Sequence, residues 1–274
     1  MPLCDVRDVT VRFGGVTALD AVTMELLEGE LVALIGPNGA GKTTLFNVLS
    51  GIQRPAAGDI IYRNQSISLL DPTERARLGV GRTFQTPQAF GSLTVLDNLL
   101  LPGWLPRFGG VLADLIPLPG AGRAQRAARD RARGVAAFLG VEDTLERYPS
   151  ELPLGKRRLI ELARALCAEP RLLLLDEPAS GLDADETERF AELLLRVRDV
   201  FRLTLLLVEH DMQLVLSIAD YLYVLNFGKL LAQGAPNDVV STPAVVAAYL
   251  GGAEDNGPAG AATQHARPAN GGRG

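Results

Sequence analysis

A glycine-rich segment followed by a lysine and two threonines carries the most specific chemistry in this sequence. It reads Gly36-Pro37-Asn38-Gly39-Ala40-Gly41-Lys42-Thr43-Thr44. Glycines at this spacing let consecutive backbone N–H groups turn toward a phosphate chain. Lys42 then reaches the terminal phosphates, Thr43 offers its hydroxyl to a bridging magnesium ion, and Thr44 donates to a phosphate. The segment therefore predicts a site for a nucleoside triphosphate and Mg²⁺.

The flanks of this segment are those that a phosphate-binding loop requires. The apolar run Leu31–Ile35 precedes it as a strand, and Leu45–Leu49 follows as a helix whose dipole adds positive potential at the loop. The alternative is a glycine turn that only joins a strand to a helix. Such a turn has no need of the Lys42-Thr43 pair, so we predict a phosphate loop.

An acidic pair, Asp176 and Glu177, supplies the second half of the predicted chemistry. Both residues follow the run Leu172–Leu175, so they lie at the carboxyl end of a buried strand, where open α/β sheets bind ligands. We assign to Asp176 the holding of magnesium, usually through water, and to Glu177 the role of general base toward the attacking water. The alternative is an acidic pair that only adds solubility.

Two further polar residues gain a role from this context. Gln85 lies in Arg82-Thr83-Phe84-Gln85, at the entrance to a helical region, and His210 ends the last apolar run in Val208-Glu209-His210-Asp211-Met212. Alone, either residue would be an ordinary surface or hydrogen-bonded side chain. Together with the loop and the acidic pair, both residues become candidates for the site, with His210 placed to contact the terminal phosphate.

The elements that must position these residues form an α/β core. Short β-prone segments separated by Gly and Pro punctuation predict a largely antiparallel layer beside the phosphate-loop strand: Val6 to Phe13, Val22 to Leu27 and Asp59 to Tyr62. Continuous apolar runs at Leu172–Leu175 and Leu203–Val208 are typical of parallel strands that helices bury on both faces.

The chain is expected to divide into a phosphate-loop domain over residues 1–250 and a tail over residues 251–274. Helical patterns interrupted by Pro and Gly predict a helical insertion over about 94–168, including an arginine-rich stretch from Arg123 to Arg133. We interpret this stretch as a solvated helix face, with contact to lipid head groups or a partner as the alternative. The tail is rich in Gly, Ala and Pro, and we expect it to be disordered.

Composition limits the classes of function. With 274 residues, a hydrophobic fraction of 47% and a net charge of −5, the chain has ample apolar material for a core and lacks the basic excess of proteins that bind bare nucleic acid. We expect no signal peptide, and the two cysteines form no metal or disulfide grouping. The stretch from Leu99 to Pro119 is too broken to span a bilayer, so any membrane crossing must come from other chains.

The ordered set of motifs resembles the ATPase subunits of ABC transporters over about nine-tenths of the chain. The resemblance implies ATP as the nucleotide and a Q-loop at Gln85, whose side chain is expected to contact the magnesium site. It also implies a D-loop at Ser180-Gly181-Leu182-Asp183, with Asp183 at the shared nucleotide site, and a switch histidine at His210. Phe13 resembles the aromatic residue that stacks on adenine, although tyrosine is commoner there.

The signature motif departs from this family pattern. LSGGQ is represented by Leu152-Pro153-Leu154-Gly155-Lys156, so the serine hydroxyl that would contact a γ-phosphate is absent, while Gly155 remains. We expect Pro153 to suit the first turn of the helix that follows. In this family two ATPase subunits sandwich two ATP molecules, and each signature faces the partner's phosphate loop. The resemblance therefore predicts an asymmetric pair, weakened at the partner's nucleotide.

Within the family the strongest likeness is to the larger ATPase of branched-chain amino-acid importers. It rests on Arg82-Thr83-Phe84-Gln85, the insertion after Leu100, Glu209-His210-Asp211-Met212 and Ala248-Tyr249-Leu250-Gly251. The likeness implies a peripheral subunit at the cytoplasmic face of the membrane. Its expected partners are a second ATPase, different or identical, two permease subunits and, indirectly, an extracytoplasmic binding protein, with no nucleic acid. Importers for urea or short amides, a lipid or lipopolysaccharide exporter, and a soluble ABC ATPase of DNA repair or ribosomes are the alternatives.

Overall fold

A computed structural model describes residues 2–83, 89–104 and 121–250. The strands are β1 (Pro2–Phe13), β2 (Val16–Leu27), β3 (Leu31–Ile35), β4 (Ala57–Tyr62), β5 (Gln65–Ser66), β6 (Val80–Arg82), β7 (Leu172–Asp176), β8 (Thr204–Val208), β9 (Tyr221–Asn226) and β10 (Lys229–Gly234). The α-helices are α1 (Lys42–Leu49), α2 (Pro72–Arg77), α3 (Val95–Leu100), α4 (Ala121–Phe138), α5 (Leu154–Cys167), α6 (Ala184–Phe201), α7 (Met212–Ile218), α8 (Pro236–Val240) and α9 (Pro243–Leu250). Short 3₁₀ helices are η1 (Leu101–Trp104), η2 (Glu142–Thr144) and η3 (Pro149–Glu151).

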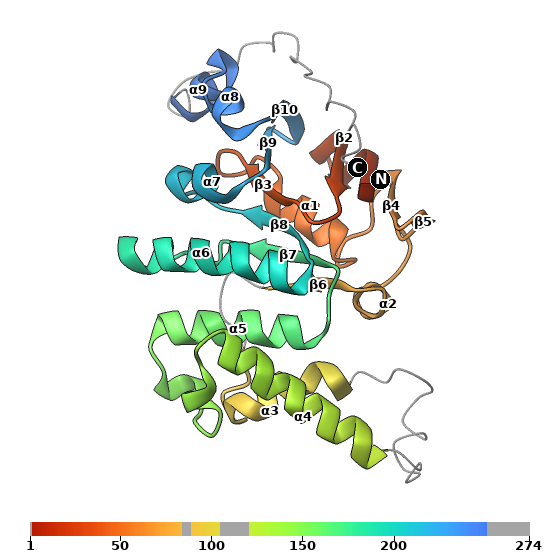
Figure 1. The fold of residues 1–274 in the computed structure, drawn as a ribbon. Coiled ribbons are helices and arrows are strands. Elements are labelled where there is room, and N and C mark those ends of the chain that lie inside the picture. Colours follow the sequence, from red (N-terminus) through yellow and green to blue (C-terminus); the bar gives the residue numbers. More distant parts are fainter. Residues whose placement is uncertain (1, 84–88, 105–120, 251–274) are drawn as a thin grey trace, which may run out of the picture.

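A mixed sheet with the strand order β10-β9-β3-β8-β7-β6 forms the centre of the described chain (Figure 1). All neighbouring strands are parallel except the antiparallel pair β9 and β10. Every residue of β3, β7 and β8 is buried, which explains why these strands are continuous apolar runs. The predicted parallel core is confirmed, although β8 begins at Thr204 rather than at Leu203 because Arg202 ends α6 in a left-handed conformation with φ 53°.

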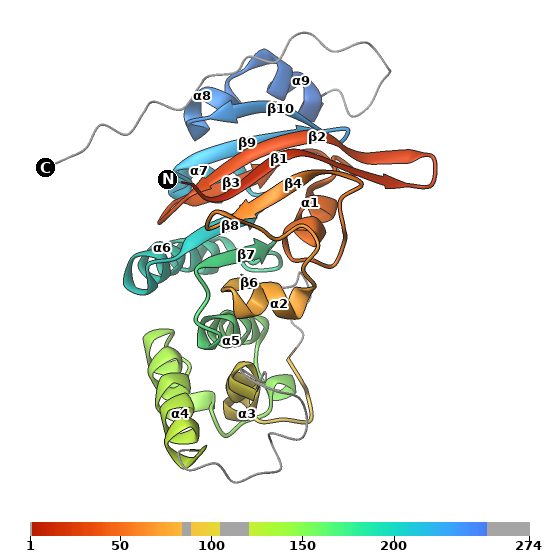
Figure 2. The ribbon, with the colours of Figure 1, turned by 90° about the vertical axis from the view of Figure 1, so that its right-hand side faces the viewer.

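The predicted antiparallel layer is a second sheet with the order β2-β1-β4-β5. Val6 lies opposite Met24 on one side and Ile60 on the other, and all three side chains are buried. They share an apolar cluster with Leu45 and Phe46 of α1 and with one face of the central sheet. Figure 2 shows this layer lying across the central sheet, with α1 close to it. The layer thus covers the phosphate-loop helix.

The other face of the central sheet is covered by helices. Leu173 and Leu175 of β7 face a cluster that includes Leu194 of α6 and Ile160 of α5, whereas Leu172 and Leu174 face the antiparallel layer. This alternation follows from the two-residue period of a strand. The same alternation places Asp176, the buried last residue of β7, on the side of Leu172 and Leu174, and Glu177 follows directly after the strand.

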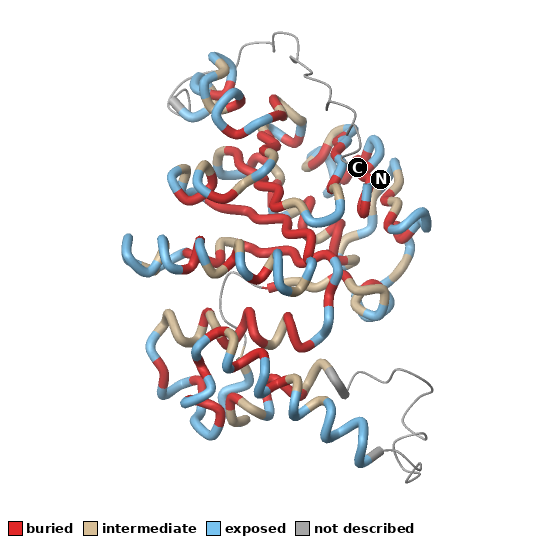
Figure 3. Tube along the Cα trace, viewed as in Figure 1, coloured by how far each residue is buried: buried red, intermediate tan, exposed pale blue. Residues whose placement is uncertain are grey.

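Helices α3, α4 and α5 and the short helices between them lie at one end of the molecule, in the region where the sequence predicts a helical insertion (Figure 1). Helix α4 buries Ala132, Val135 and Ala136 at helical spacing and exposes most of its arginines, as the burial pattern in Figure 3 illustrates. Arg131 is half-buried and pairs with Glu169 at 2.6 Å. The expected tail, residues 251–274, lies outside the described residues.

Both cysteines are buried in this framework, Cys4 in β1 and Cys167 at the end of α5. Burial raises the pKa of each thiol to about 12. A thiol with so high a pKa is a poor nucleophile and a poor metal ligand at neutral pH. The packing of the two side chains therefore agrees with the apolar role expected from the sequence.

Candidate nucleotide site

The phosphate loop runs from the end of β3 to the start of α1, and its shape depends on two glycines. At Gly36 φ is 152°, and a Cβ would lie 2.2 Å from the Leu225 carbonyl oxygen. At Gly41 φ is 105°, and a Cβ would lie 2.8 Å from the Ala18 carbonyl oxygen. Side chains at these positions would displace β2 and β9, so both glycines are required for the loop to pass beneath these strands.

The loop is further held by hydrogen bonds with its neighbours. The Gly228 N–H donates to the Ala40 carbonyl at 2.9 Å, and the Ala40 N–H donates to the Pro37 carbonyl at 3.1 Å. Asn38 and Gly39, at the crest, are exposed. The base of the loop is therefore fixed, while its crest is accessible to a ligand.

Lys42 folds back over this loop. Its Nζ donates to the Gly36 carbonyl at 2.6 Å and to the Pro37 carbonyl at 3.1 Å, and the residue is buried. Burial lowers the pKa of Lys42, and the nearby charges of Glu177 and Asp176 act in the opposite direction. Thr43 is exposed and Thr44 half-buried in the first turn of α1. The lysine therefore brings a positive charge to the loop beside two carboxylates.

The acidic pair takes two different environments. Asp176 is buried, and its Oδ2 accepts a hydrogen bond from Arg82 Nη2 at 2.9 Å. Glu177 adopts a left-handed φ of 47°, and its Oε1 lies 2.8 Å from His210 Nε2. A glutamate with positive φ is uncommon, and such strain is typical of functional sites. The ends of β3, β7 and β8 thus bring together Lys42, Asp176, Glu177 and His210. We call these four residues, the phosphate loop and Arg82 the phosphate-loop cluster.

A buried carboxylate that sequence reasoning did not single out, Glu209, ties this cluster to the segment after β7. Its Oε1 accepts from the Ala179 N–H at 2.9 Å and its Oε2 from the His210 N–H at 3.1 Å. Burial raises the pKa of Glu209, whereas these two hydrogen bonds act in the opposite direction. The sequence shows Glu209 as a carboxylate next to His210. The spacing of residues does not indicate that this carboxylate accepts a hydrogen bond from the Ala179 N–H.

The predicted nucleotide contacts Gly155 and Asp183 lie in a different cluster, formed by the starts of α5 and α6. A Cβ on Gly155 would lie 3.2 Å from Glu186 Oε1, and Gly181 packs against the Leu154 side chain. Arg158 Nη2 also donates to the Ser180 carbonyl at 3.0 Å. We call residues 153–158 and 180–183 the signature cluster.

Asp183 has a structural task in this cluster. It caps α6 by accepting from the Glu186 N–H at 2.8 Å, and the Glu186 side chain accepts from the Asp183 N–H at 3.2 Å. This reciprocal pair is a capping box. Within this chain the carboxylate of Asp183 is therefore already engaged in fixing the start of α6.

Pro153 differs slightly from expectation. It precedes the first helical residue of α5 as the N-cap rather than standing in the first turn, with φ −57° and ψ 159°. Its carbonyl accepts from the Arg157 N–H at 3.1 Å, but its ring offers no acceptor to the free N–H groups of the first turn. Those N–H groups therefore lack the side-chain cap that a serine would supply.

Among the described predicted residues, Phe13 belongs to neither cluster. Phe13 ends β1 beside the turn to β2 and is 51% exposed, as a ring available for stacking would be. Gln85 lies outside the described residues. The sequence does not single out Tyr249 of α9 for the site; burial raises the pKa of its hydroxyl, while the Gly36 backbone acts in the opposite direction.

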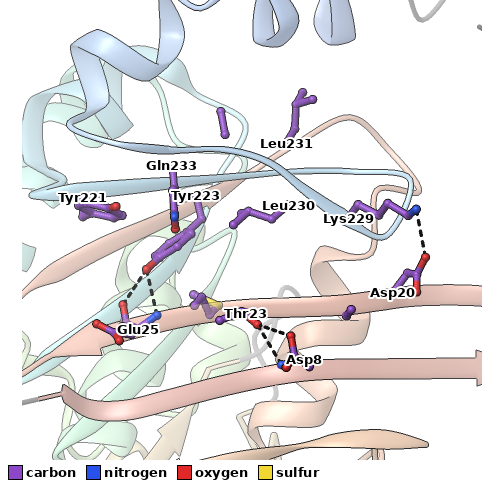
Figure 4. Close-up of a pocket in the computed structure, with 13 residues that line it drawn as sticks. Asp8, Asp20, Thr23, Glu25, Tyr221, Tyr223, Lys229, Leu230, Leu231 and Gln233 are labelled. Atoms are coloured by element: carbon purple, nitrogen blue, oxygen red, sulfur yellow. Dashed lines mark hydrogen bonds and ion pairs between the residues drawn. The ribbon is translucent and has the colours of Figure 1, made fainter. Parts of the chain in front are cut away.

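A separate hollow of about 590 Å³ lies between β2 and the pair β9 and β10 (Figure 4). None of the described candidate residues lines it. Figure 4 shows Lys229 paired with Asp20, Thr23 bonded to Asp8, and the Tyr223 hydroxyl bonded to the Glu25 backbone. These side chains already have partners, so the hollow presents no converging polar groups for a ligand.

The phosphate-loop cluster offers oxygen atoms that could bind a magnesium ion together with phosphate oxygens and water. Within the described residues no group of three or more His, Cys, Asp or Glu side chains could hold a metal ion by itself. Mg²⁺ is usually bound through one or two protein oxygens with phosphate oxygens and water. The exposed Thr43 hydroxyl and the Asp176 carboxylate are such oxygens, so the residues present fit this ion.

Comparison with known proteins gives consistent matches. The family model of the ABC transporter matches residues 19–180. The high-affinity branched-chain amino acid transport ATP-binding protein LivG of Escherichia coli (strain K12) is 42% identical over 250 residues, which cover 91% of this chain and 98% of that protein. The corresponding protein BraF of Pseudomonas aeruginosa is 39% identical over the same shares of both chains.

Solved structures agree with these sequence matches. The crystal structure of a nucleotide-free ATP-binding cassette from an ABC transporter matches with a TM-score of 0.80 at 30% identity, covering 91% of this chain and 99% of the other. An ATP-binding cassette of an ABC transporter in its ADP conformation matches with a TM-score of 0.80 at 32% identity, covering 92% and 99%. The architecture is therefore that of solved ATP-binding cassettes.

Proposed function

This chain belongs to the ABC transporter family, and we propose that it is the ATP-hydrolysing subunit of an importer for branched-chain amino acids. The observation that carries the ATPase assignment is the grouping of Lys42, Asp176, Glu177 and His210 at the ends of three neighbouring strands. The cargo is supported by the likeness to LivG and BraF, which extends over almost their whole length. The same likeness favours import over lipid or lipopolysaccharide export.

We propose that the loop from Gly36 to Thr44 holds the phosphates of ATP. Backbone N–H groups at the crest and the start of α1 favour negative charge, and Lys42 adds its ammonium group. A phosphate chain would exchange the carbonyl partners of Lys42 Nζ for anionic oxygens, which make stronger hydrogen bonds. Phe13 is proposed to stack on the adenine ring.

Magnesium is proposed to be held by Thr43, Asp176 and Gln85, and when bound it neutralises phosphate charge. Glu177 is proposed as the general base that accepts a proton from the attacking water. In the Nε2–H tautomer, His210 donates to Glu177 Oε1 and holds that carboxylate in place. A terminal phosphate oxygen would offer the ring a more strongly charged acceptor, and Glu177 could then turn toward the attacking water.

Other subunits are proposed to complete the transporter. No helix within the described ranges is long and apolar enough to cross a membrane. A groove of about 310 Å³ between β6 and α5 is lined by apolar and charged side chains, including Phe90, Leu101, Glu161 and Arg164. We propose that a permease segment docks in this groove at the cytoplasmic face of the membrane. A second ATPase subunit is proposed to place its own signature on the nucleotide bound by Lys42.

The test is cargo-stimulated ATP hydrolysis by the assembled complex. The chain is co-purified with its permeases and second ATPase in proteoliposomes, and binding protein is added with leucine, isoleucine or valine. We expect these amino acids to stimulate hydrolysis, and urea and acetamide to have no effect. Lys42→Ala in this chain should weaken ATP binding by about 100-fold or more, because the buried site loses its charged phosphate partner.

The outcomes separate the two parts of the proposal. Stimulation by urea or a short amide alone would reject the amino-acid cargo and leave the ATPase assignment in place. Absence of ATP hydrolysis from the wild-type complex would reject the ATPase assignment itself.

A further inference from the structure

Arg82, the last residue of β6, makes contacts that link the two halves of the phosphate-loop cluster. Its Nη2 donates to Asp176 Oδ2 at 2.9 Å, and its Nη1 donates to Asn47 Oδ1 at 2.7 Å and to Ser50 Oγ at 3.0 Å. Its guanidinium carbon lies 5.7 Å from the centre of the Phe46 ring. One side chain therefore connects the end of β7 with the second half of α1, the helix that follows the phosphate loop.

We infer that Arg82 is a positioning residue that holds Asp176 in the orientation needed for magnesium. This inference rests on the proposed function, because it takes Asp176 as part of the magnesium site. It concerns a fork of hydrogen bonds within this chain, with Asp176 on one side and α1 on the other.

The burial of the contact supports this role. The side chains of Arg82 and Asp176 are each only 9% exposed. A carboxylate in such surroundings is poorly solvated, so a fixed hydrogen-bond donor beside it determines its orientation. Because Arg82 Nη2 occupies Oδ2, the carboxylate plane is set by a hydrogen bond that does not depend on a ligand. The second carboxylate oxygen is left for the magnesium site.

The strand pairing keeps the fork in register. Arg82 lies opposite Leu174 in the parallel pair of β6 and β7, and the Thr83 N–H donates to the Leu174 carbonyl at 2.9 Å. The guanidinium thus reaches along β7 to Asp176, two residues beyond its backbone partner. A shorter or more flexible side chain could not contact Asp176, Asn47 and Ser50 together, because only the planar fork of arginine carries donors in two directions.

A second buried arginine, Arg75, provides an internal comparison. Its Nη1 donates to the Leu49 carbonyl at 2.9 Å and also contacts the Val48 carbonyl, and its Nη2 donates to the Ser68 carbonyl at 3.2 Å. Both arginines therefore donate hydrogen bonds to the end of α1, but the described hydrogen bonds of Arg75 go to backbone carbonyls. Loss of Arg75 should weaken the fold around α1 without altering the orientation of Asp176.

The test measures magnesium dependence of nucleotide binding, not turnover. A fluorescent, non-hydrolysable ATP analogue is titrated with MgCl₂ against the wild-type chain and the variants Arg82→Met, Arg82→Lys and Arg75→Met. Residues that orient metal ligands typically change metal affinity by about 10- to 100-fold. We expect the half-saturating Mg²⁺ concentration to rise at least about tenfold in Arg82→Met and less in Arg82→Lys, which keeps the charge but loses the fork.

The controls distinguish orientation from stability. Binding of the analogue in EDTA should be the same for wild type and Arg82→Met. Arg75→Met should lower the melting temperature while leaving the half-saturating Mg²⁺ concentration within about twofold of wild type, since its bonds orient no metal ligand. Where Arg82→Met does not fold, Arg82→Lys carries the test, with an expected rise of about threefold or more.

Three results would overturn the role of Arg82. An unchanged half-saturating Mg²⁺ concentration would mean that the arginine is only structural. A lower half-saturating Mg²⁺ concentration would mean that the positive charge of Arg82 opposes magnesium binding, and that this repulsion outweighs any benefit from orienting the carboxylate. An equal shift in Arg75→Met would assign the effect to α1 in general. Failure of the wild-type chain to bind the analogue at all would instead reject the proposed function.

Discussion

The phosphate-loop cluster and the signature cluster differ in how completely this chain builds them. In the phosphate-loop cluster the ion pair of Arg82 and Asp176 is buried, with both side chains 9% exposed. In the signature cluster, Lys156 pairs with Asp143, and the two side chains are 34% and 70% exposed. Buried, hydrogen-bonded charges are held in one arrangement, whereas exposed pairs contribute little and are screened by salt.

The difference shows which part of the site depends on a partner. Lys42, Asp176, Glu177 and His210 are oriented by bonds within this chain before any ligand arrives. The start of α5 presents Pro153 and Gly155 at the surface without a side-chain cap. We therefore expect substitutions in the first cluster to have large effects on this chain's own nucleotide, and those in the second to act through the partner.

The largest effect should come from Glu177→Gln. The amide keeps the size of the side chain but cannot take the proton from water, so ATP hydrolysis should fall by about 100- to 10,000-fold. ATP binding should stay within about threefold of wild type, because Lys42 and the loop are unchanged. Single-turnover hydrolysis and equilibrium binding measure the two quantities.

Glu192→Gln is a suitable control for this variant, because Glu192 is exposed on α6. It should leave both quantities unchanged. Steady turnover in Glu177→Gln would remove Glu177 as the base and would weaken the distinction between the two clusters.

A smaller effect is expected from Glu209→Gln. The carboxylate accepts hydrogen bonds from the Ala179 and His210 N–H groups, one on each oxygen. The amide has a single oxygen and can replace only one of these two bonds. Leaving one buried N–H unsatisfied costs about 1–3 kcal/mol, which would loosen the alignment of His210 with Glu177. We expect kcat to fall about tenfold while KM for ATP changes by less than about threefold.

Asp211→Asn is the matched control for Glu209→Gln. Asp211 is exposed and accepts from the Gln213 and Leu214 N–H groups at the start of α7, a task that asparagine also performs. Its kcat should remain near that of wild type. An equal loss in both variants would show that any change next to His210 has this effect, and Glu209 would have no special part in positioning.

The smallest effect is expected from Asp143→Asn. The hydrogen bond from Lys156 holds the pKa of Asp143 below its ordinary range, so the ionised form is favoured in the folded state. The resulting stability is present above the ordinary pKa of the carboxyl and is lost as pH falls through the lower, folded-state value. Melting temperatures of wild type and variant should therefore differ slightly at pH 7 and converge in acid, with hydrolysis unchanged.

A fall in ATP hydrolysis comparable to that of Glu209→Gln would contradict this expectation. It would mean that the exposed pair of Lys156 and Asp143 fixes the signature cluster as firmly as buried bonds fix the phosphate-loop cluster. Raised salt provides a second check, because it should remove the small difference in melting temperature at pH 7.

Much of this arrangement follows from sequence. The apolar runs at β3, β7 and β8 predict the parallel core, and the order of Lys42, Asp176 and Glu177 at strand ends predicts their meeting, because parallel strands end at one edge of a sheet. The strands of the antiparallel layer begin earlier in the chain than the sequence predicts. Strand β2 begins at Val16, in a stretch whose polar and exposed residues do not alternate clearly with buried ones.

What the sequence did not reveal are the partners of buried charges. Arg82 and Asp176 are 94 positions apart, and Glu209 bonds a backbone N–H 30 positions away. Hydrophobic period and turn chemistry indicate which elements form, but they do not indicate which carboxylate an arginine will meet once layers pack. The sequence likewise shows that Pro153 lacks the hydroxyl of a serine. It does not show that Pro153 is the N-cap, because that depends on the residue at which α5 begins.

The most direct test of the difference between the two clusters is Pro153→Ser in the assembled complex with the partner ATPase. Vanadate trapping of a photoreactive radiolabelled ATP, followed by separation of the subunits, reports which phosphate loop holds trapped nucleotide. A restored hydroxyl adds one hydrogen bond to a charged phosphate, worth about 1.5–3 kcal/mol. We predict at least about tenfold more trapping on the partner subunit, unchanged trapping on this chain, and no gain with Pro153→Ala. Equal increases on both subunits, or none on either, would contradict the account.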